Sequence, residues 1–410
     1  MKTVLFACAG EIADNTLRCG SWIEAIAGGL KDTFSIRFAV LTPDQTPPTH
    51  GSVCQSGASF DAYYGDASKA REVIRAAVKD APDAVVLFGT ESDASYALWK
   101  ALEAEGLTDR TALFAQGIAS SCARHLCEGI PARIVRQRTL RDLLRRDGLT
   151  DRVKDFRRRG EQENEMMRRA RHFIGRTSFD RAALFAVNPD CAYYRCGDLM
   201  RPAFYARQWS YRDCEKHTVF TSQFYHPVKG FHYLLEAAGL LLRKYPDLKI
   251  VAAGYNPIRK DFQTRELRDS AYIRYLKTLA VQYGVADRIT LTGPLSAEQM
   301  AEQYCRANVF VLPSSIENSP NSLGEAMLLG VPCVAADVGG VADLARHETE
   351  ALLYPSTAPY MLAHDIDRVF SDSETAERLA KNGRARARTE YDREKNLDAL
   401  RCAFSAIAEG

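Results

Sequence analysis

The feature that most constrains this chain is the stretch from Asn308 to Gly340. A short apolar run, Val309–Leu312, leads into a polar loop and a short helical segment, and a second apolar run, Val331–Ala335, leads into a Gly-Gly pair. Short, continuous apolar runs bounded by turn residues are typical of strands buried in a parallel sheet. The stretch therefore predicts one strand–loop–helix–strand unit of an α/β fold.

Two acidic residues stand out in this unit. Glu317 lies in the loop, and Glu325 is expected in the first turn of the helix. Helix N-termini favour anions, and carboxylates accept hydrogen bonds from sugar hydroxyls, so the unit suits a nucleotide sugar. A purely structural interpretation stays open, because Ser322-x-x-Glu325 also fits a capping box and Pro320 after Ser319 offers another cap.

The spacing of the two acids resembles a known signature. Glu317 and Glu325 are separated by seven residues, as in the family-four glycosyltransferases, which are retaining enzymes of the GT-B fold. Small and turn-forming residues also stand where that family has them: Asn321, Gly330, Pro332, Gly339 and Gly340. The resemblance covers the second half of the chain almost without gaps. In the first half it is weaker and rests on short pieces: Gly20-Ser21-Trp22, Gly89-Thr90-Glu91, Gln116-Gly117 and Gly175-Arg176-Thr177.

Length and patterning agree with two domains. The chain has 410 residues, and apolar strands alternate with helical segments in both halves. With the resemblance, this predicts an α/β, GT-B fold of two Rossmann-like parallel-sheet domains with an intervening cleft. We expect an acceptor-side domain over 1–200, a linker over 201–215, a nucleotide-sugar-binding domain over 216–390, and a helix over 391–410 that packs back on the first domain.

In the first half, we expect Val4–Ala7 to be a buried strand rather than part of a signal peptide. A long loop, Gly10–Gly20, should follow it. Because ligands of open α/β sheets bind at the carboxyl ends of strands, this loop is a candidate site. It lacks the G-x-G-x-x-G pattern, which argues against a dinucleotide oxidoreductase. After a strand over Phe34–Leu41, the next expected element is a helix over Ala67–Val78.

Charge and cysteine usage bear on the partners. Arginines dominate residues 133–171, which fits either a solvated helical face with internal ion pairs or a surface for an anionic membrane or phosphorylated acceptor. Few aromatic residues are interleaved there, so we expect no nucleic-acid binding. The 11 cysteines are scattered without a C-x-x-C pair, and no apolar run reaches the length of a membrane span. We expect a cytoplasmic protein with peripheral contact at the inner membrane face.

The resemblance implies roles for individual residues. Lys229, before a helix, would stabilise the leaving diphosphate, and Glu317 would contact donor-sugar hydroxyls near the reacting carbon, so these two are the predicted catalytic residues. Glu325 would bind the ribose hydroxyls. Main-chain groups would contact the diphosphate, the sugar and the base at these positions: Asn321, Ser322, Leu323, Gly293, Pro294, Leu295, Gly339 and Gly340.

The chain departs from the family pattern at two places. Where the family usually has an arginine before the lysine, this sequence has Gln223 and Phe224, and Arg259 or Lys260 could supply the charge instead. Where it commonly has a histidine, this sequence has Gln116, with His125 a little further on. We count Gln223, Gln116 and Gly20 among the donor-binding residues.

The predicted function is retaining transfer of a sugar, from a UDP-sugar by family habit, to a glycan or lipid-linked acceptor in cell-surface polysaccharide or glycolipid synthesis. No cofactor or metal is expected, since Asp365 and Asp367 lie two apart on a predicted helix and point to different sides. The alternative is a catalytically silent GT-B subunit that partners another transferase. A sugar-nucleotide epimerase of the same fold fits less well.

Overall fold

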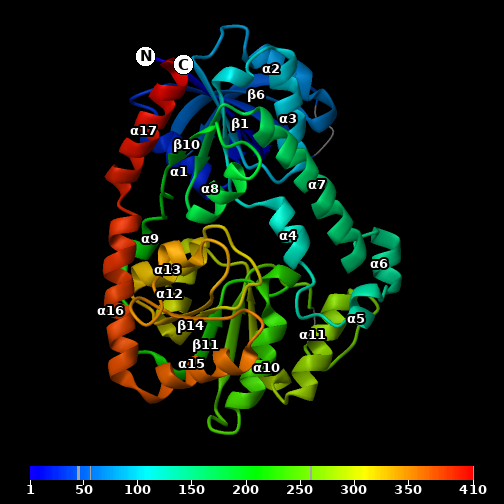
Figure 1. Cartoon of the computed structure of the whole chain (residues 1–410), viewed down its shortest axis with the longest axis vertical. Helices are drawn as coiled ribbons and strands as arrows, with labels where there is room; N and C mark the ends of the chain where they lie inside the picture. Colours follow the sequence, from blue (N-terminus) through cyan, green and yellow to red (C-terminus); the bar gives the residue numbers. More distant parts are fainter. Residues whose placement is uncertain (44–46, 56, 259–260, 410) are drawn as a thin grey trace. The chain divides into compact units, whose positions relative to one another are not determined.

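The computed structural model describes residues 1–43, 47–55, 57–258 and 261–409 (Figure 1). The chain forms two compact units. Unit 1 contains residues 1–120, 157–200 and 391–410, and unit 2 contains residues 121–156 and 201–390. From the sequence we expected all of 1–200 to belong to the first domain and 201–215 to be a linker. In the structure, residues 121–156 and 201–215 belong to unit 2.

Unit 1 is built on one sheet with the strand order β10-β9-β8-β7-β1-β4-β6-β5-β3-β2. Its strands are β1 (Thr3–Ala9), β2 (Glu11–Ala13), β3 (Thr16–Arg18), β4 (Ser35–Thr42), β5 (Thr49–Gln55), β6 (Ala58–Asp66), β7 (Ala84–Phe88), β8 (Thr111–Phe114), β9 (His172–Gly175) and β10 (Ala192–Arg195). From β10 to β6 every pairing is parallel. Antiparallel pairs occur only at the other end of the described sheet.

Helices cover both faces of this sheet, which is why its central strands are apolar on both sides. On β1, Val4 and Phe6 belong to one buried cluster, and Leu5 and Ala7 to another on the opposite face. The helices wholly within unit 1 are α1 (Ser21–Leu30), α2 (Ala70–Ala77), α3 (Asp93–Ala104), α8 (Ser178–Phe185) and α17 (Arg393–Glu409). Helix α17 contacts α1 and adds its apolar side to the first cluster (Figure 1).

Two hairpins in unit 1 differ from the sequence prediction. The predicted loop Gly10–Gly20 is wrong, because it contains the antiparallel pair β2–β3. Asp14 and Asn15, both with positive φ, form the turn, and two such residues in succession match the twist of a hairpin. The second hairpin, β5–β6, fills the segment between the expected strand Phe34–Leu41 and the expected helix Ala67–Val78.

Unit 2 contains a second sheet, wholly parallel in its described pairings, with the order β13-β12-β11-β14-β15-β16. Its strands are β11 (Glu215–Thr221), β12 (Lys249–Ala253), β13 (Ile289–Gly293), β14 (Ala307–Leu312), β15 (Cys333–Ala336) and β16 (Leu352–Tyr354). The order changes direction at β11 and β14, the two central strands. In open α/β sheets, ligands bind at the carboxyl ends of strands beside such a switch point.

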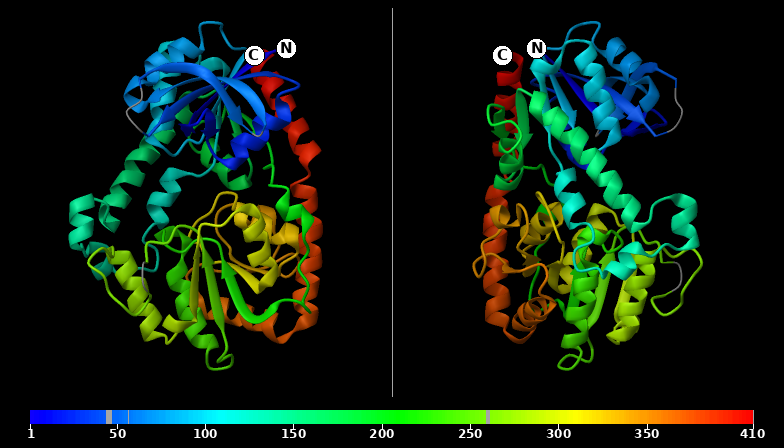
Figure 2. Two further views of the ribbon diagram at one scale, coloured as in Figure 1. Left: turned by 180° about the vertical axis from the view of Figure 1, so that it is seen from behind. Right: turned by 45° about the vertical axis from the view of Figure 1, so that its right-hand side comes forward.

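The helices of unit 2 form two groups. They are α5 (Ala132–Arg136), α6 (Leu140–Arg145), α9 (Ala203–Ala206), α10 (Phe231–Leu241), α11 (Ala271–Gln282), α12 (Ala297–Arg306), α13 (Asn321–Leu329), α14 (Val341–Leu344), α15 (Pro359–Ser371) and α16 (Ser373–Glu390). Helix α10 contacts α11 and α15, whereas α13 contacts α9, α12 and α16. Figure 2 shows α10 and α11 on one side of the strands and α12 and α13 on the other.

Two helices continue from one unit into the other: α4 (Ala119–His125) and α7 (Leu149–Arg169). Between them lie α5 and α6, which belong to unit 2. Along the described residues, each helix is either too short or too polar to cross a lipid bilayer.

Candidate functional site

Three loops meet at the carboxyl ends of β11, β14 and β15. The first contains Gly230, whose φ is +64°, and a Cβ on it would lie 1.8 Å from the carbonyl oxygen of Pro313 in the second loop. The third contains Gly339, with φ +54°, and a Cβ there would lie 1.9 Å from the carbonyl oxygen of Glu317. Only glycine combines positive φ with so close an approach. The two glycines therefore fix the first and third loops against the second.

Lys229 and Glu317 form an ion pair across these loops. The Lys229 Nζ lies 2.6 Å from the Glu317 Oε1, and Ser314 Oγ donates to the same oxygen at 2.7 Å. Both side chains are largely shielded, with 27% of Lys229 and 11% of Glu317 exposed. Because Lys229 lies at the start of α10, the helix dipole disfavours its charge, and Glu317 compensates it. The structure thus brings the two predicted catalytic residues together.

Glu325 is also largely shielded, and its place in the helix differs from the prediction. Helix α13 begins at Asn321, so Glu325 is in the second turn rather than the first. The residue at the cap position is Pro320, and no side chain caps this helix. The capping-box interpretation of Ser322 and Glu325 is therefore wrong, and Glu325 does not serve the helix start.

Glu325 is held by two other side chains. Arg201 donates from Nη2 to its Oε1 at 2.9 Å, and the Tyr304 hydroxyl donates to its Oε2 at 3.2 Å. Only 8% of Glu325 is exposed, and this burial raises its pKa, while the charge and hydrogen bond of Arg201 act in the opposite direction. The carboxylate is a buried acid with a fixed orientation. It keeps further acceptor capacity, since two carboxylate oxygens offer about four lone-pair directions.

Arg201 is the residue that the sequence reasoning missed. It comes from the segment taken as a linker, which contains the short helix α9 and belongs to unit 2. Its guanidinium also lies 4.9 Å from the centre of the Phe204 ring. The only available signal was an arginine beside Pro202 and several aromatic residues, and 124 positions separate it from Glu325.

The start of α13 presents main-chain and amide groups. The Leu323 side chain is fully buried, and its N–H donates to the Pro320 carbonyl at 3.0 Å. Asn321 and Ser322 are half-buried. Within the described part of the chain, the Asn321 Oδ1 is buried without a hydrogen-bond partner. The contacts of these three residues with a ligand stay a prediction, and for Leu323 the N–H is already engaged.

The turn after β13 is joined to the turn after β12. Gly293 has φ +73°, and its carbonyl accepts the Gly254 N–H at 3.0 Å. Pro294 is exposed and Leu295 half-buried, so this edge is open to a ligand. Gln223 is exposed and lies beside Gly254, since a Cβ on Gly254 would be 3.7 Å from the Gln223 Cγ.

The residues at the two departures from the family pattern, and those that could replace the missing groups, have different outcomes. Phe224 is fully buried and packs against Phe231, so it is a core residue. Arg259 and Lys260 lie outside the described residues. The Nδ1 of His125 lies 2.5 Å from the Glu128 Oε2, in a local pair one helical turn away.

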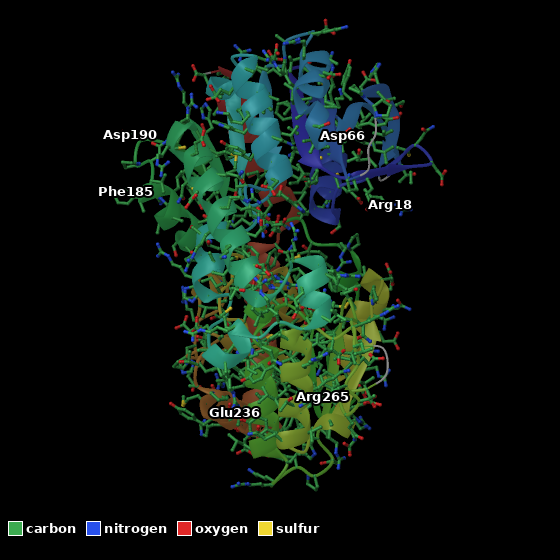
Figure 3. All side chains as sticks on the ribbon, turned by 90° about the vertical axis from the view of Figure 1, so that its right-hand side faces the viewer. Arg18, Asp66, Phe185, Asp190, Glu236 and Arg265 are labelled. Carbon is green, nitrogen blue, oxygen red and sulfur yellow. The ribbon has the colours of Figure 1, made fainter. Side chains whose placement is uncertain are left out.

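Gly20 and Gln116 belong to unit 1. Gly20 has φ +103° and precedes α1, and Gln116 is exposed after β8. A depression of about 650 Å³ opens at the carboxyl ends of β1, β4 and β6. Its polar lining includes Glu11, Arg18 and Asp66, and Figure 3 labels the last two.

The two aspartates of the D-x-D pattern have separate environments. Asp365 is buried and faces Arg368, whereas Asp367 accepts hydrogen bonds from Lys244 and Tyr245 at 2.6 and 2.5 Å. As predicted, the two carboxylates do not share one site.

Comparison with known proteins identifies the part of the chain that contains this site. Residues 207–386, somewhat less than half of the chain, match the family described as glycosyl transferases group 1. The alpha-D-kanosaminyltransferase of Streptomyces kanamyceticus is 32% identical over 154 residues, which cover 38% of this chain and 36% of that protein. The matches thus span less than half of the length of these curated relatives, 36% of the kanosaminyltransferase and 37% of the putative glycosyltransferase YtcC of Bacillus subtilis.

Solved structures share the fold over nearly the whole chain. Sucrose-phosphate synthase from Thermosynechococcus elongatus superposes with a TM-score of 0.72 at 18% identity, covering 99% of this chain and 100% of that one. HepE of Anabaena in complex with UDP-glucose superposes with a TM-score of 0.67 at 15% identity, with the same coverage. The fold is GT-B, as predicted.

Proposed function

We propose that this protein is a glycosyltransferase that moves a sugar, with retention, from a nucleotide sugar to a glycan or lipid-linked acceptor. The observation that carries the proposal is the Lys229–Glu317 pair, fixed by three interlocked loops at the switch point of unit 2. It lies within the segment that matches the glycosyl transferases group 1 family.

The charge balance of the pair suits a diphosphate leaving group. An ammonium group has three N–H donors, and Glu317 accepts one of those of Lys229. The other two can donate to phosphate oxygens, and the nearby start of α13 adds the positive end of a helix dipole. Charge that develops on the leaving phosphate is stabilised without a divalent metal.

The two glutamates take different tasks in this proposal. Glu317 is held beside Lys229 by the interlocked loops and accepts hydrogen bonds from hydroxyls of the donor sugar. Glu325 is fixed by Arg201 and Tyr304 and accepts the ribose hydroxyls with its remaining lone pairs. A carboxylate oriented before the ligand arrives loses little entropy when it binds.

Retention follows from an arrangement in which the acceptor hydroxyl attacks on the face that the diphosphate leaves. The bond from the anomeric carbon to the phosphate oxygen breaks, the bond to the acceptor oxygen forms, and the leaving phosphate takes the acceptor proton. Lys229 stabilises that phosphate in our proposal. The donor is a UDP-sugar, and the HepE structure in complex with UDP-glucose supports this choice.

We assign the acceptor to unit 1, where the depression at β1, β4 and β6 presents Arg18, Asp66 and Glu11 to hydroxyl or phosphate groups. The pathway we propose is cell-surface polysaccharide or glycolipid synthesis in the cytoplasm, where the nucleotide sugars are made.

A panel of UDP-, GDP-, ADP- and CMP-sugars, without metal, tests the proposal by thermal shift. One nucleotide class should raise the melting temperature of the wild type, and Glu325→Ala should abolish the shift. The matched control is Glu302→Ala, which removes an exposed acid from α12 in the same unit and should leave the shift intact.

A wild type that no nucleotide stabilises would contradict the donor site. The chain would then be better described as a silent subunit of another transferase.

A further inference from the structure

The basic segment at 133–171 contains two kinds of arginine. Several of its arginines are paired with acids, and the pairs include Arg138–Asp151, Arg141–Asp147, Arg158–Asp93, Arg169–Glu103 and Arg171–Asp109. Among the described residues, these exposed arginines lie in no such pair: Arg133, Arg136, Arg145, Arg146, Arg157 and Arg168. The first four lie on or directly beside α5 and α6, and the other two lie on α7.

Helix α6 is attached to unit 2 by polar groups instead of by its leucines. Asp142 is fully buried, and its Oδ2 accepts the N–H of Thr139 at 3.1 Å and the N–H of Ala271 at 2.9 Å. Thr139 closes a capping box with the same carboxylate. Amphipathic helices normally bury their apolar side chains and expose the polar ones. Helix α6 does the opposite.

The leucines of α6 face solvent. Their exposed fractions are 62% for Leu140, 52% for Leu143 and 77% for Leu144. Residues three and four apart lie on one face of a helix, so the three leucines form a single apolar stripe. Arg145 and Arg146 follow the stripe directly. Large apolar side chains gathered in this way on a surface mark an interaction site.

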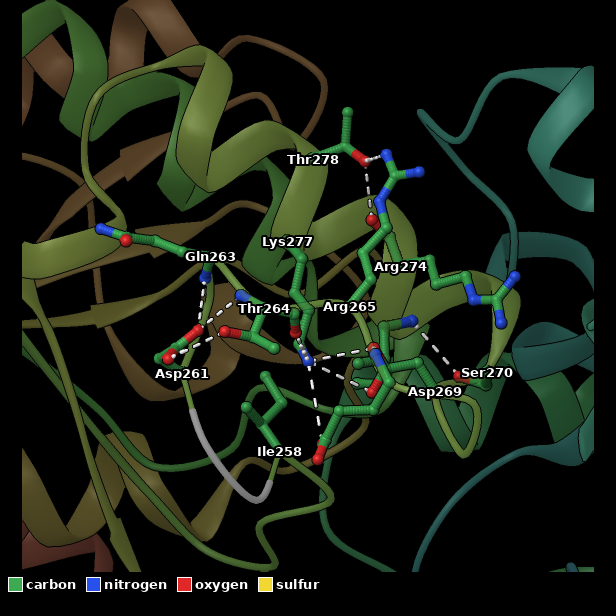
Figure 4. Close-up of polar contacts among 12 residues, drawn as sticks. Ile258, Asp261, Gln263, Thr264, Arg265, Asp269, Ser270, Arg274, Lys277 and Thr278 are labelled. Atoms are coloured by element: carbon green, nitrogen blue, oxygen red, sulfur yellow. Dashed lines mark hydrogen bonds and ion pairs between the residues drawn. The ribbon is translucent and has the colours of Figure 1, made fainter.

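The stripe continues on a neighbouring loop. Leu267 is 80% exposed, and together with Arg268 it lines the same depression of about 420 Å³ as Leu140 and Leu144. Figure 4 shows how this loop is fixed. The buried Lys277 donates to Asp269 at 3.0 Å and to the Thr264 carbonyl at 2.6 Å.

We propose that this leucine–arginine surface docks the protein on an anionic lipid bilayer. The surface consists of these residues: Leu140, Leu143, Leu144, Arg145, Arg146, Leu267 and Arg268. The leucines would enter the boundary between headgroups and acyl chains, and the arginines would lie at the level of the phosphates. Polar anchors position the leucines before binding, so little order has to be imposed at the membrane.

Charge favours a lipid surface over a second copy of the chain. A two-fold interface would place the same patch against itself, and its like-charged arginines would repel each other. Anionic headgroups complement all three arginines at once. The inference does not depend on the proposed transferase function, because docking on a bilayer needs no donor.

The depression also reaches Tyr225, on the loop that ends at Lys229. If the transferase proposal holds, docking would bring that loop close to an acceptor carried by a lipid. This consequence rests on the proposed function and is tested separately from it.

Vesicle sedimentation with the full chain tests the docking. The wild type should pellet with vesicles that contain phosphatidylglycerol but not with phosphatidylcholine alone, and rising salt should weaken its binding. Arg145→Glu with Arg146→Glu should lower the partition coefficient at least about 30-fold, since each arginine near an anionic surface contributes about a factor of five. Leu143→Asp with Leu144→Asp should abolish the binding.

Matched control variants distinguish binding through this surface from nonspecific adsorption to vesicles. Phe185→Asp replaces a side chain that is 68% exposed on α8 (Figure 3), and Arg243→Glu reverses an exposed charge after α10. Both should pellet as the wild type does. Because the substituted leucines are exposed, the melting temperature of that variant should stay within a few degrees of the wild type.

Two results would overturn the proposal. One is equal vesicle binding by the wild type and the double-leucine variant. The other is absence of vesicle binding together with a concentration-dependent dimer that the leucine substitutions dissolve, which would make this face an interface between copies.

Discussion

Replacing Gly230 with alanine should test whether the interlocked loops create the Lys229–Glu317 geometry. A Cβ at position 230 would lie 1.8 Å from the Pro313 carbonyl oxygen, and contacts of this kind below 3.0 Å essentially never occur. The two loops must therefore separate by about 1.2 Å. The carbonyl is main chain and cannot rotate away like the end of a side chain. Lys229 is the adjacent residue, so the change moves one partner of the ion pair.

The expected loss of stability in Gly230→Ala has two parts. The left-handed backbone, with φ +64°, costs an alanine about 1–2 kcal/mol, and forcing apart packed loops costs about 1–3 kcal/mol more. Gly284→Ala is the matched control. Its φ is +70°, but the nearest atom to an added Cβ is the Leu242 Cδ1 at 3.9 Å, an ordinary contact. Gly284→Ala should therefore lose only the stability that the left-handed backbone costs an alanine.

Urea unfolding of both variants, followed by donor titration, checks this reasoning. Gly230→Ala should be the less stable variant and should lose about 100-fold in transfer rate, the usual effect of a displacement near 1 Å in a reacting group. Gly284→Ala should retain wild-type transfer. Equal stability of the two variants, with unchanged transfer in Gly230→Ala, would refute the argument that backbone contact positions Lys229.

Three further outcomes follow from the site and from unit 1. Lys229→Met should weaken binding of a nucleoside diphosphate by about 10- to 100-fold, the range of one charge-assisted hydrogen bond, as measured by calorimetry. Arg201→Met should raise the pKa of Glu325 further, because Arg201 opposes the effect of burial. As the pH is lowered, Glu325 of the variant should therefore take up a proton, and the variant should lose donor binding, at a higher pH than the wild type does. Burial raises the pKa of Glu163 to about 8, so the native state holds a proton that the unfolded chain releases above about pH 5. The contribution of Glu163 to stability should therefore fall by roughly 1.4 kcal/mol per pH unit as pH rises from about 5 to 8. Urea unfolding of the wild type and of Glu163→Gln at several pH values should show this as a change in the difference between the two, because the contributions of other titrating groups are common to both.

The strand–loop–helix–strand unit at Asn308–Gly340 could be predicted because its determinants are local. The expected strands correspond to β14 and β15, and the expected helix between them is α13 (Asn321–Leu329), which contains Glu325. The strand expected over Val4–Ala7 likewise lies within β1. In each case a continuous apolar run between turn residues has few alternatives to a buried parallel strand.

The hairpins of unit 1 could not be predicted in the same way. Strand β6 contains a glycine and two aspartates, and β5 begins directly after two prolines. Such sequences carry little strand propensity, and pairing across the sheet overrides it. The turn at Asp14 and Asn15 was the one local signal.

The environment of Glu325 depends on contacts that no spacing reveals. Arg201 approaches from a segment without periodicity, and Tyr304 approaches from the inner face of α12. The partner of Lys229 was likewise expected to be a bound diphosphate, and Glu317 also fills that role. The orientation of α6 was hidden because its exposed leucines fit the pattern of an ordinary amphipathic helix.

Calorimetric titration of UDP and UMP, in EDTA, tests the central claim most directly. If Lys229 binds the diphosphate, the wild type should bind UDP more tightly than UMP. In Lys229→Met this advantage should shrink by about 10-fold or more, with UMP affinity little changed. Equal losses for both nucleotides, or an unchanged preference for UDP in the variant, would contradict the assignment of the diphosphate to Lys229.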